Sequence, residues 1–322
     1  MQPADYEKLM EDLESELLRG ARAVGILGLT PVTTKLIADI ASARQTPALT
    51  AVFADRPSSE SICWSEVPVK PLQSMGDSAL DVLVVASDED KEDLLEAAVP
   101  FILGAPKVIV AGYGHLRFRD RMFTEELAQL LVPSLANGYP NTLPHLYQCL
   151  ANAARTGLRG VVAEFGMFKG GTTMFLSRLI ERLGQDWPVI GFDTFGGFPP
   201  RRSPLDMYDH PGCVFENLGA VRHYVQGTRI EIVPGDIVQT CHRLDTEDLV
   251  LTFIDTDNYT SAKAAIDVVR ERTVLGGAIV FDHFTGLDRF RYTLGERIAA
   301  KTLLGDVHYF NLHDTGVFFR QR

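Results

Sequence analysis

Short apolar runs alternate with amphipathic segments over the first 112 residues. The apolar runs have the length of buried strands and predict strands at 23–29, 48–54, 79–87 and 107–112. The segments between them carry apolar residues at helical spacing and predict helices at 4–21, 31–43 and 88–103. Because strands that alternate with helices favour a parallel sheet covered by helices, we expect a small Rossmann-like α/β domain here.

The same alternation returns after residue 158. It predicts strands at 160–165, 188–193, 230–236, 249–255 and 278–282, with helices at 171–184 and 261–273. Two further runs, 307–312 and 315–320, are typical of a closing hairpin. We therefore expect a doubly wound sheet with an antiparallel C-terminal edge. Residues 113–158 interrupt the pattern, with Gly, Pro and Asn at turn-forming spacing in 137–147, and we place the domain join near residue 125. The expected domains are 1–125 and 126–322.

Composition narrows the class of protein. The chain has 322 residues, a net charge of −11 and no Lys/Arg-rich block, which argues against a nucleic-acid partner. Apolar runs are broken well before the length of a membrane span, and the acidic N-terminus lacks the pattern of a signal peptide, so we expect a cytoplasmic protein without a membrane partner. The four cysteines show no metal or CxxC spacing, which favours inert thiols: Cys63, Cys149, Cys213 and Cys241.

The first domain lacks the fingerprint of a dinucleotide-binding fold. The turn after its first strand reads GLTPVT, without the Gly-x-Gly-x-x-Gly that would cradle a pyrophosphate. This favours a scaffold or partner domain. It could position a large acceptor, bind a carrier protein or mediate dimerisation, and the residues do not choose among these roles. We expect a homo-oligomer.

In the second domain, a glycine-rich turn follows the first strand in the stretch EFGMFKGGTT, residues 164–173. Glycines allow a close backbone approach to a ligand, and the missing Gly-Lys-Ser/Thr ending excludes a P-loop. An acidic residue on the strand suits a ligand with a positive centre, such as a sulfonium with an amino-acid tail. The alternative is an ordinary strand-to-helix turn. The candidate cofactor contacts are Glu164, Gly166, Lys169, Gly170 and Thr172.

Two more acids follow the next strands. Asp193 comes at the end of the strand 188–193, where an acid accepts hydrogen bonds from ribose hydroxyls in doubly wound nucleotide binders. Asp236 follows the next strand and would lie near an adenine amino group. Between them, residues 198–213 are rich in Gly and Pro and read either as a substrate lid or as a plain surface loop.

The stretches LTFIDTDNYT and AIVFDHFTG, residues 251–260 and 278–286, both run from a buried strand into acids. Ligands of an open parallel sheet bind beyond the carboxyl ends of its strands, so Asp255 and Asp282 should reach one crevice. Carboxylates that repel one another favour a bound Mg²⁺, and His283 beside them would shift the preference toward Mn²⁺, Fe²⁺ or Zn²⁺. The alternative is a pair of solvated acids.

These motifs together resemble the macrocin O-methyltransferase family. The likeness covers roughly residues 135–320, with EFGMFKGGTT, GFDTFGGFPP, VPGD, IDTDNY and IVFDHF in the family's order. The family consists of S-adenosylmethionine- and Mg²⁺-dependent enzymes that methylate sugar hydroxyls in macrolide and aminocoumarin antibiotics. The resemblance implies a class I methyltransferase fold and a hydroxylated small-molecule acceptor, which could be linked to a sugar or a carrier.

The resemblance also assigns roles to residues. It implies that Asp255 ligates the metal, that Asp257 is the general base, and that Asp282 is a second ligand. The family usually has Asp-Asp at the fifth strand, and His283 departs from that pattern, which leaves the metal's identity open. Two other readings stay open. D-x-D is also how many glycosyltransferases hold Mn²⁺ and a nucleotide sugar, and the chain could be a non-catalytic cofactor-binding protein.

Overall fold

The chain folds as two compact units, Met1–Phe118 and Arg119–Arg322. The break precedes the join expected near residue 125, so that α4 (Arg121–Ala128) is part of the second unit. In the described part of the chain, no helix combines the length and the apolar composition needed to cross a bilayer. The structure is a computed structural model that describes residues 1–42, 47–55, 63–64, 67–136, 142–285, 288–313 and 315–322.

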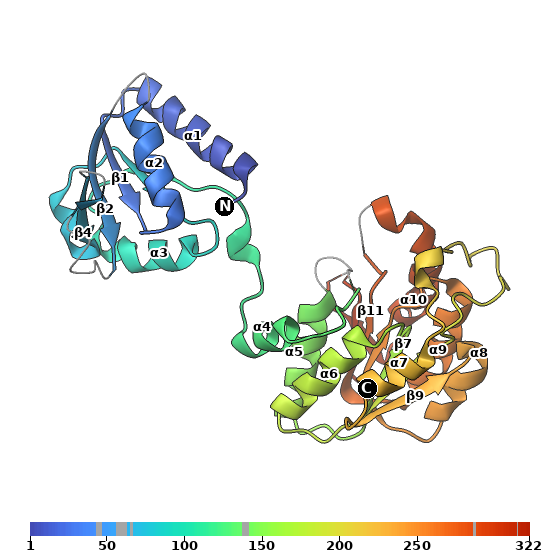
Figure 1. Cartoon of the computed structure of the whole chain (residues 1–322). Coiled ribbons are helices and arrows are strands. Elements are labelled where there is room, and N and C mark those ends of the chain that lie inside the picture. Colours follow the sequence, from blue (N-terminus) through green and yellow to red (C-terminus); the bar gives the residue numbers. More distant parts are fainter. Residues whose placement is uncertain (43–46, 56–62, 65–66, 137–141, 286–287, 314) are drawn as a thin grey trace. The chain divides into compact units, whose positions relative to one another are not determined.

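The first unit is a six-stranded sheet of order β3-β4-β2-β1-β5-β6, parallel except where β3 pairs with β4. Helices α1 and α2 pack on one face of the sheet, and α3 covers the other (Figure 1). The expected smaller α/β domain is confirmed. Its elements are α1 Pro3–Leu18, β1 Ala23–Leu27, α2 Pro31–Ala41, β2 Ala48–Ala54, β3 Cys63–Trp64, β4 Val67–Pro71, β5 Val82–Val85, α3 Lys91–Ala98 and β6 Lys107–Ile109.

Polar groups at the carboxyl ends of β1 and β5 bond to protein. Thr30 caps α2 and donates its hydroxyl to the Ala86 carbonyl oxygen at 2.5 Å. The ammonium group of Lys91, whose side chain is buried, donates to Asp88 at 3.0 Å and to two backbone carbonyl oxygens. A ligand at this crevice would have to compete with these contacts. They accord with the missing phosphate-binding fingerprint.

The second unit is a seven-stranded sheet of order β12-β13-β11-β10-β7-β8-β9. Strands β7 to β11 run parallel, β13 runs antiparallel to β11, and β12 pairs antiparallel with β13. The doubly wound sheet and the C-terminal hairpin are thus confirmed. The elements are α4 Arg121–Ala128, α5 Thr142–Arg155, β7 Val161–Phe165, α6 Gly171–Arg182, β8 Val189–Asp193, α7 Leu218–Tyr224, β9 Ile230–Pro234, α8 Ile237–Thr240, β10 Leu249–Ile254, α9 Tyr259–Arg272, β11 Thr273–Phe281, α10 Leu294–Leu304, β12 Tyr309–Asn311 and β13 Val317–Arg320.

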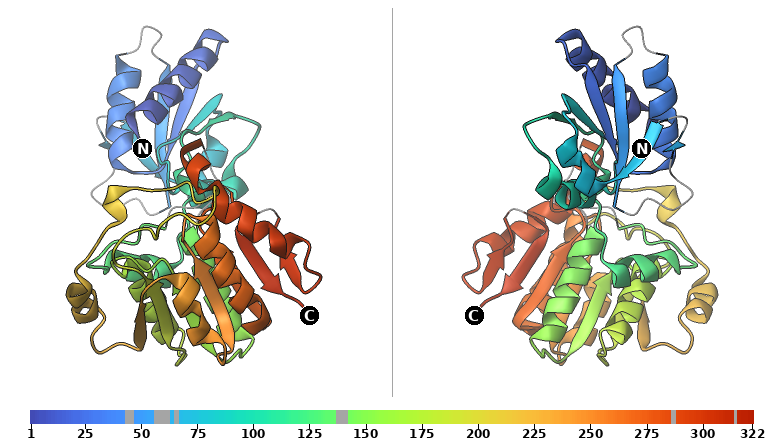
Figure 2. Two further views of the ribbon diagram at one scale, coloured as in Figure 1. Left: turned by 90° about the vertical axis from the view of Figure 1, so that its right-hand side faces the viewer. Right: turned by 90° about the vertical axis from the view of Figure 1, so that its left-hand side faces the viewer.

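Helices cover both faces of this second sheet. The residues of α9 and α10 form one apolar core with the central strands, while α5 and α6 pack on the opposite face. The two views of Figure 2 look at these faces in turn, with the orange helix toward the viewer in one and the green helices in the other. Chain order reverses between β7 and β10, which makes the carboxyl ends of these two strands the topological switch point where ligands bind in such folds.

Two local predictions were wrong in the residues that the structure describes. Of the stretch 137–147, where turns were expected, residues 142–147 belong to α5; residues 137–141 lie outside the described part. Pro144 is tolerated because it sits in the first turn of that helix, where its missing N–H costs no hydrogen bond. The helix expected over 88–103 ends at Ala98, and Pro100 lies in the 3₁₀ turn that follows.

One glycine sets the spacing of the two central loops at the switch point. Gly166 follows β7 with φ +95°, and a Cβ built there would lie 1.9 Å from the carbonyl oxygen of Asp255. A side chain therefore meets both the left-handed backbone and a fixed carbonyl. Because Gly166 has no side chain, the backbone of Asp255 occupies the space beside it. The loop after β10 therefore lies directly against the loop after β7.

We predict that Gly166→Ala lowers the free energy of unfolding of the second unit by about 3 kcal/mol or more, because strain and a backbone clash add. Urea unfolding measures the change. Gly305→Ala is the matched control, since its Cβ would meet no atom within 4 Å, and it should change stability by less than about 0.5 kcal/mol. Equal effects of the two substitutions would contradict the packing argument.

Candidate active site

A cavity of about 420 Å³ opens at the carboxyl ends of β7, β8, β10 and β11. This lies in the range of roughly 300–1,000 Å³ typical of small-molecule sites. A second cavity of about 130 Å³ adjoins it at the glycine turn, and the two share Leu135, Gly166, Phe168 and Asp255. The predicted residues that line one or both are Gly166, Lys169, Thr172, Asp193, Asp255, Asp257, Asp282 and His283.

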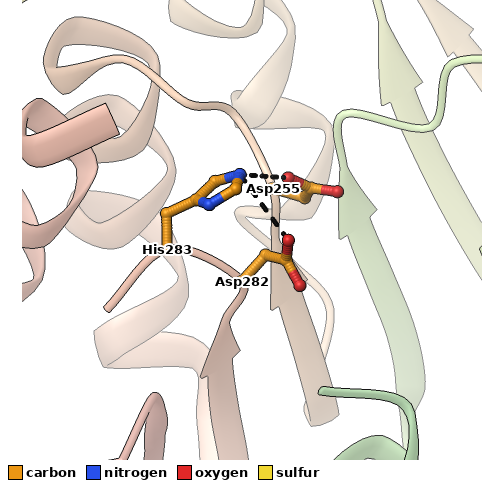
Figure 3. Close-up of side chains that lie close together, drawn as sticks. All are labelled: Asp255, Asp282 and His283. Atoms are coloured by element: carbon orange, nitrogen blue, oxygen red, sulfur yellow. Dashed lines mark ion pairs between the residues drawn. The ribbon is translucent and has the colours of Figure 1, made fainter. Parts of the chain in front are cut away.

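The strand-end acids converge on one imidazole. His283 Nε2 lies 3.0 Å from Asp257 Oδ1, 3.3 Å from Asp255 Oδ1 and 3.6 Å from Asp282 Oδ2. Figure 3 shows the ring of His283, which follows Asp282 at the end of β11, directed at Asp255 at the end of β10 and at the carboxylate of Asp282. The ligand atoms that Asp255, Asp282 and His283 offer all lie within 4.8 Å of one another. The structure therefore brings together the three residues that the sequence predicts to share one crevice.

Burial and charge set the protonation of this group. Burial disfavours an imidazolium and lowers the pKa of His283, but the carboxylates of Asp255 and Asp257 outweigh it and raise that pKa to about 12. Burial raises the pKa of Asp255, with the hydrogen bond from His283 acting against it. A cationic centre among these carboxylates is therefore strongly favoured, whether it is a proton on His283 or a metal ion.

Glu296 is a site residue that sequence analysis missed. It lies on α10 with none of its surface exposed, and its carboxylate accepts backbone N–H groups of Thr256, Asp257 and His283. Burial raises the pKa of Glu296 to about 8. A signal existed, because Glu296 shares its helix face with the buried Ala299, Ala300 and Leu303, so that it is an acid on an otherwise apolar stripe.

The glycine turn places its residues in two groups. Lys169 and Thr172 line the smaller cavity, where the Lys169 ammonium lies 4.9 Å from the centre of the Phe168 ring. Glu164 and Gly170 line neither cavity. Glu164 is buried, its carboxylate accepts the hydroxyl of Thr173 on α6, and burial raises its pKa well above the usual range. In this structure Glu164 ties the strand to the helix.

The two acids after the next strands differ in position. Asp193 lines the larger cavity, and its oxygens accept the N–H groups of Phe168 and Phe195, each at 2.7 Å. Asp236 does not line it; this acid caps α8 and pairs with Arg202, while the next residue, Ile237, forms the wall. Of the two acids, Asp193 alone faces the larger cavity, and its bond to the N–H of Phe168 also holds the glycine turn in place.

Residues 198–213 form an anchored wall of the larger cavity. Asp206 is buried and accepts the N–H groups of Arg202 and Ser203 within the loop and both the N–H and the hydroxyl of Thr260 on α9. Asn258 bonds the backbone of Tyr208 in both directions at 2.9 Å. The loop is thus attached to the start of α9 by side chains that sequence analysis did not single out. It presents Phe198, Pro199, Tyr208, Gly212 and Cys213 to the cavity.

Cys213 is the one cysteine among the residues that line these cavities. Burial raises the pKa of its thiol to about 11, with Asp257 and Asp255 adding to the shift. A thiol with so high a pKa is protonated at neutral pH and is a weak nucleophile. Cys213 therefore lines the cavity as a neutral thiol.

The strand order, the closing hairpin and the acids at successive strand ends define a class I methyltransferase domain. Residues 139–321 match the family described as Macrocin-O-methyltransferase (TylF), and the chain belongs to this family. The resemblance inferred from five motifs is confirmed. The match begins after the first unit, which the family does not cover.

Individual relatives are distant. The chain is 22% identical over 155 residues to the 8-demethyl-8-(2,3-dimethoxy-alpha-L-rhamnosyl)-tetracenomycin-C 4'-O-methyltransferase of Streptomyces olivaceus, across 44% of this chain and 59% of that protein. It thus spans less than two thirds of that relative's length. Among solved structures it is similar to the O-methyltransferase NovP, with 19% identity, a TM-score of 0.45, and coverage of 55% and 78% of the two chains. The calicheamicin methyltransferase CalS11 gives 20% identity, a TM-score of 0.41, and coverage of 62% and 89%.

We predict that Asp206→Ala frees the loop 198–213, because it removes an acceptor of four hydrogen bonds. Trypsin should then cleave after Arg201 or Arg202 at least about tenfold faster than in the parent protein. Asp209→Ala is the control, since Asp209 is exposed in the same loop. A parent loop cleaved as fast as the Asp206 variant would show that these bonds do not hold it.

Proposed function

We propose that this protein transfers a methyl group from S-adenosylmethionine to a hydroxyl of a small molecule, with a sugar or other polyol of a natural product as the acceptor. One observation carries the proposal. Acids at the carboxyl ends of three parallel strands of one sheet, Asp193 of β8, Asp255 after β10 and Asp282 after β11, line a single cavity beside the glycine turn that follows β7. Membership of the Macrocin-O-methyltransferase family supports the reaction class, and the Streptomyces olivaceus relative, named for methylation of a rhamnosyl group, supports the acceptor class.

The two cavities suit the two ends of the methyl donor. Asp193 lines the larger cavity, and each of its oxygens has lone-pair capacity beyond the backbone N–H it accepts, which suits the two hydroxyls of a ribose. The smaller cavity, lined by Lys169 and Thr172, would take the amino-acid end. Because the sulfonium links these two parts, it would lie near Gly166 and Asp255, which line both cavities.

The residues present also fit a divalent ion. Asp255, Asp282 and His283 offer one ligand atom each within 4.8 Å of one another, and the carboxylates carry the negative charge that such an ion neutralises. We propose that these three residues would hold it. An imidazole among the ligands widens the choice from Mg²⁺ to Mn²⁺, Fe²⁺ or Zn²⁺. When bound, the ion supplies positive charge that lowers the pKa of an acceptor hydroxyl.

Asp257 is the proposed general base. Its carboxylate lines the same cavity, and its Oδ1 lies 3.0 Å from His283, next to the proposed metal ligands. The acceptor oxygen would form its bond to the methyl carbon as the carbon–sulfur bond breaks, and its proton would pass to Asp257. Proton transfer to a positioned base is worth on the order of 10²–10⁴-fold in rate. The cavity walls supply a further share by aligning the reactants.

We predict that Asp257→Asn lowers methyl transfer by about 10²-fold or more, because the amide accepts no proton at neutral pH. S-adenosylmethionine binding should stay within about threefold. Labelled S-adenosylmethionine with glycosylated acceptors, read by mass spectrometry, measures transfer, and calorimetry measures binding. Asp267→Asn, on the exposed side of α9, is the control. A weakened affinity for S-adenosylmethionine with an unchanged rate at saturating donor would assign Asp257 to donor binding instead. Binding of nucleotide sugars instead of S-adenosylmethionine would favour a glycosyltransferase.

We predict that metal removal abolishes turnover and that Mg²⁺ or Mn²⁺ restores it. Asp255→Asn should weaken binding of the added ion by at least about tenfold, because a charged ligand is lost. Calorimetric titration of metal-free protein with Mn²⁺ gives the affinity without any assay of turnover. Undiminished turnover in protein shown by elemental analysis to be metal-free would contradict the metal proposal and leave His283 as the positive partner of the acids.

A further inference from the structure

Glu296 is a fully buried acid in the first turn of α10. Burial of a carboxylate is unfavourable unless hydrogen-bond donors replace the lost water. It lines neither of the two cavities at the switch point, so its carboxylate does not face the space where substrates would bind. The groups that replace water around it therefore indicate its role.

All the donors to Glu296 come from two loops at the candidate active site. Oε2 accepts the backbone N–H groups of Thr256 at 2.8 Å and Asp257 at 2.9 Å. Oε1 accepts the backbone N–H of His283 at 3.0 Å. The first two donors belong to the loop after β10 and the third to the loop after β11. One side chain thus bonds both loops that carry the acids and the imidazole.

The bonded backbone has an unusual conformation. Asp257 has φ +60°, the left-handed region that a residue with a Cβ rarely adopts. Its N–H and that of Thr256 are consecutive and converge on one carboxylate oxygen, in the manner of the backbone nests that bind anions. By accepting both N–H groups, Oε2 of Glu296 therefore stabilises the turn that aims Asp257 at His283.

The packing of α10 brings Glu296 within reach. A Cβ on the preceding residue, Gly295, would lie 2.2 Å from the carbonyl oxygen of Leu205 and 2.9 Å from the backbone nitrogen of Tyr259. The helix begins directly against the start of α9 and against the loop 198–213. Only a residue without a side chain permits this approach, which places the next residue beneath the two strand-end loops.

We infer that Glu296 is a positioning residue, which locks the loops after β10 and β11 together and so fixes Asp257 and His283 relative to each other. A glutamine of the same shape cannot replace it. Both oxygens of Glu296 face N–H donors, whereas a glutamine side chain offers one oxygen and one NH₂ group. In Glu296→Gln, the NH₂ group therefore lies opposite the backbone N–H of at least one loop, and that N–H has no acceptor. The kinetic consequence rests on the proposed methyl transfer, but the structural consequence does not.

Hydrogen exchange of the full-length protein tests the inference. In the parent protein, the amides of Thr256, Asp257 and His283 should exchange slowly although they lie beyond the ends of their strands. In Glu296→Gln, peptides that contain the freed loop should exchange about 10- to 100-fold faster. Turnover should fall by at least about 30-fold while the affinity for S-adenosylmethionine changes less than about threefold.

Glu126→Gln is the matched control. Glu126 is also a buried helix glutamate, on α4, and it pairs with Arg178 and Arg182 away from the strand-end loops. The Glu126→Gln substitution should lower the overall stability of the protein, without faster hydrogen exchange confined to the loop after β10 or the loop after β11. Rapid exchange of the three amides in the parent protein would overturn the inference even if Glu296→Gln failed to fold. Identical exchange profiles for the two variants would also overturn it.

The two proposals fail separately. If the parent protein bound no S-adenosylmethionine and transferred no methyl group, the proposed function would fail. The exchange rates of Thr256, Asp257 and His283 would still decide the role of Glu296, because they need neither ligand nor turnover.

Discussion

The site depends on how a cluster of buried acids is stabilised. Four carboxylates, those of Asp255, Asp257, Asp282 and Glu296, share one end of the sheet with His283. Glu296 is satisfied by backbone N–H groups, while the other three face the imidazole. Like charges this close and this buried repel strongly unless donors or a cation intervene. The fold therefore has to deliver donors and a positive centre to the same place.

The parallel sheet supplies that geometry. Strands β10 and β11 end side by side, with the Asp282 N–H bonded to the Ile254 carbonyl oxygen at 3.0 Å, so residues next along each strand face one crevice. The reversal of chain order between β7 and β10 opens a cavity at the same edge. Gly166 then allows the loops after these two strands to touch through backbone alone. Topology and one missing Cβ thus bring the strand-end loops together.

Much of this could be predicted from the sequence because it depends on local pattern. Buried strands that run into Asp193, Asp255 and Asp282 predict both the parallel sheet and the edge at which its candidate site lies. Glu296 could not be assigned a role in this way, because its partners lie about 40 and 13 residues away and are backbone groups, which carry no signal of their own. Asp236 was expected to face adenine from its strand-end position alone, and the structure shows it capping α8 beside Arg202. The direction in which a side chain points depends on its partners in the folded protein, and the spacing of residues along the sequence does not reveal these partners.

The loop that forms one wall of the cavity and the acids that line the cavity are held by different contacts. The loop 198–213 presents Phe198 and Tyr208 to the cavity, but Asp206 and Asn258 attach it to the start of α9. The acids are instead attached through Glu296 to α10. Residues of the wall that face the cavity can therefore change without disturbing the bonds that orient Asp257. Under the proposed function, such a division would let one arrangement of acids serve acceptors of different shape, because affinity for the acceptor and alignment of the proposed base would depend on different contacts.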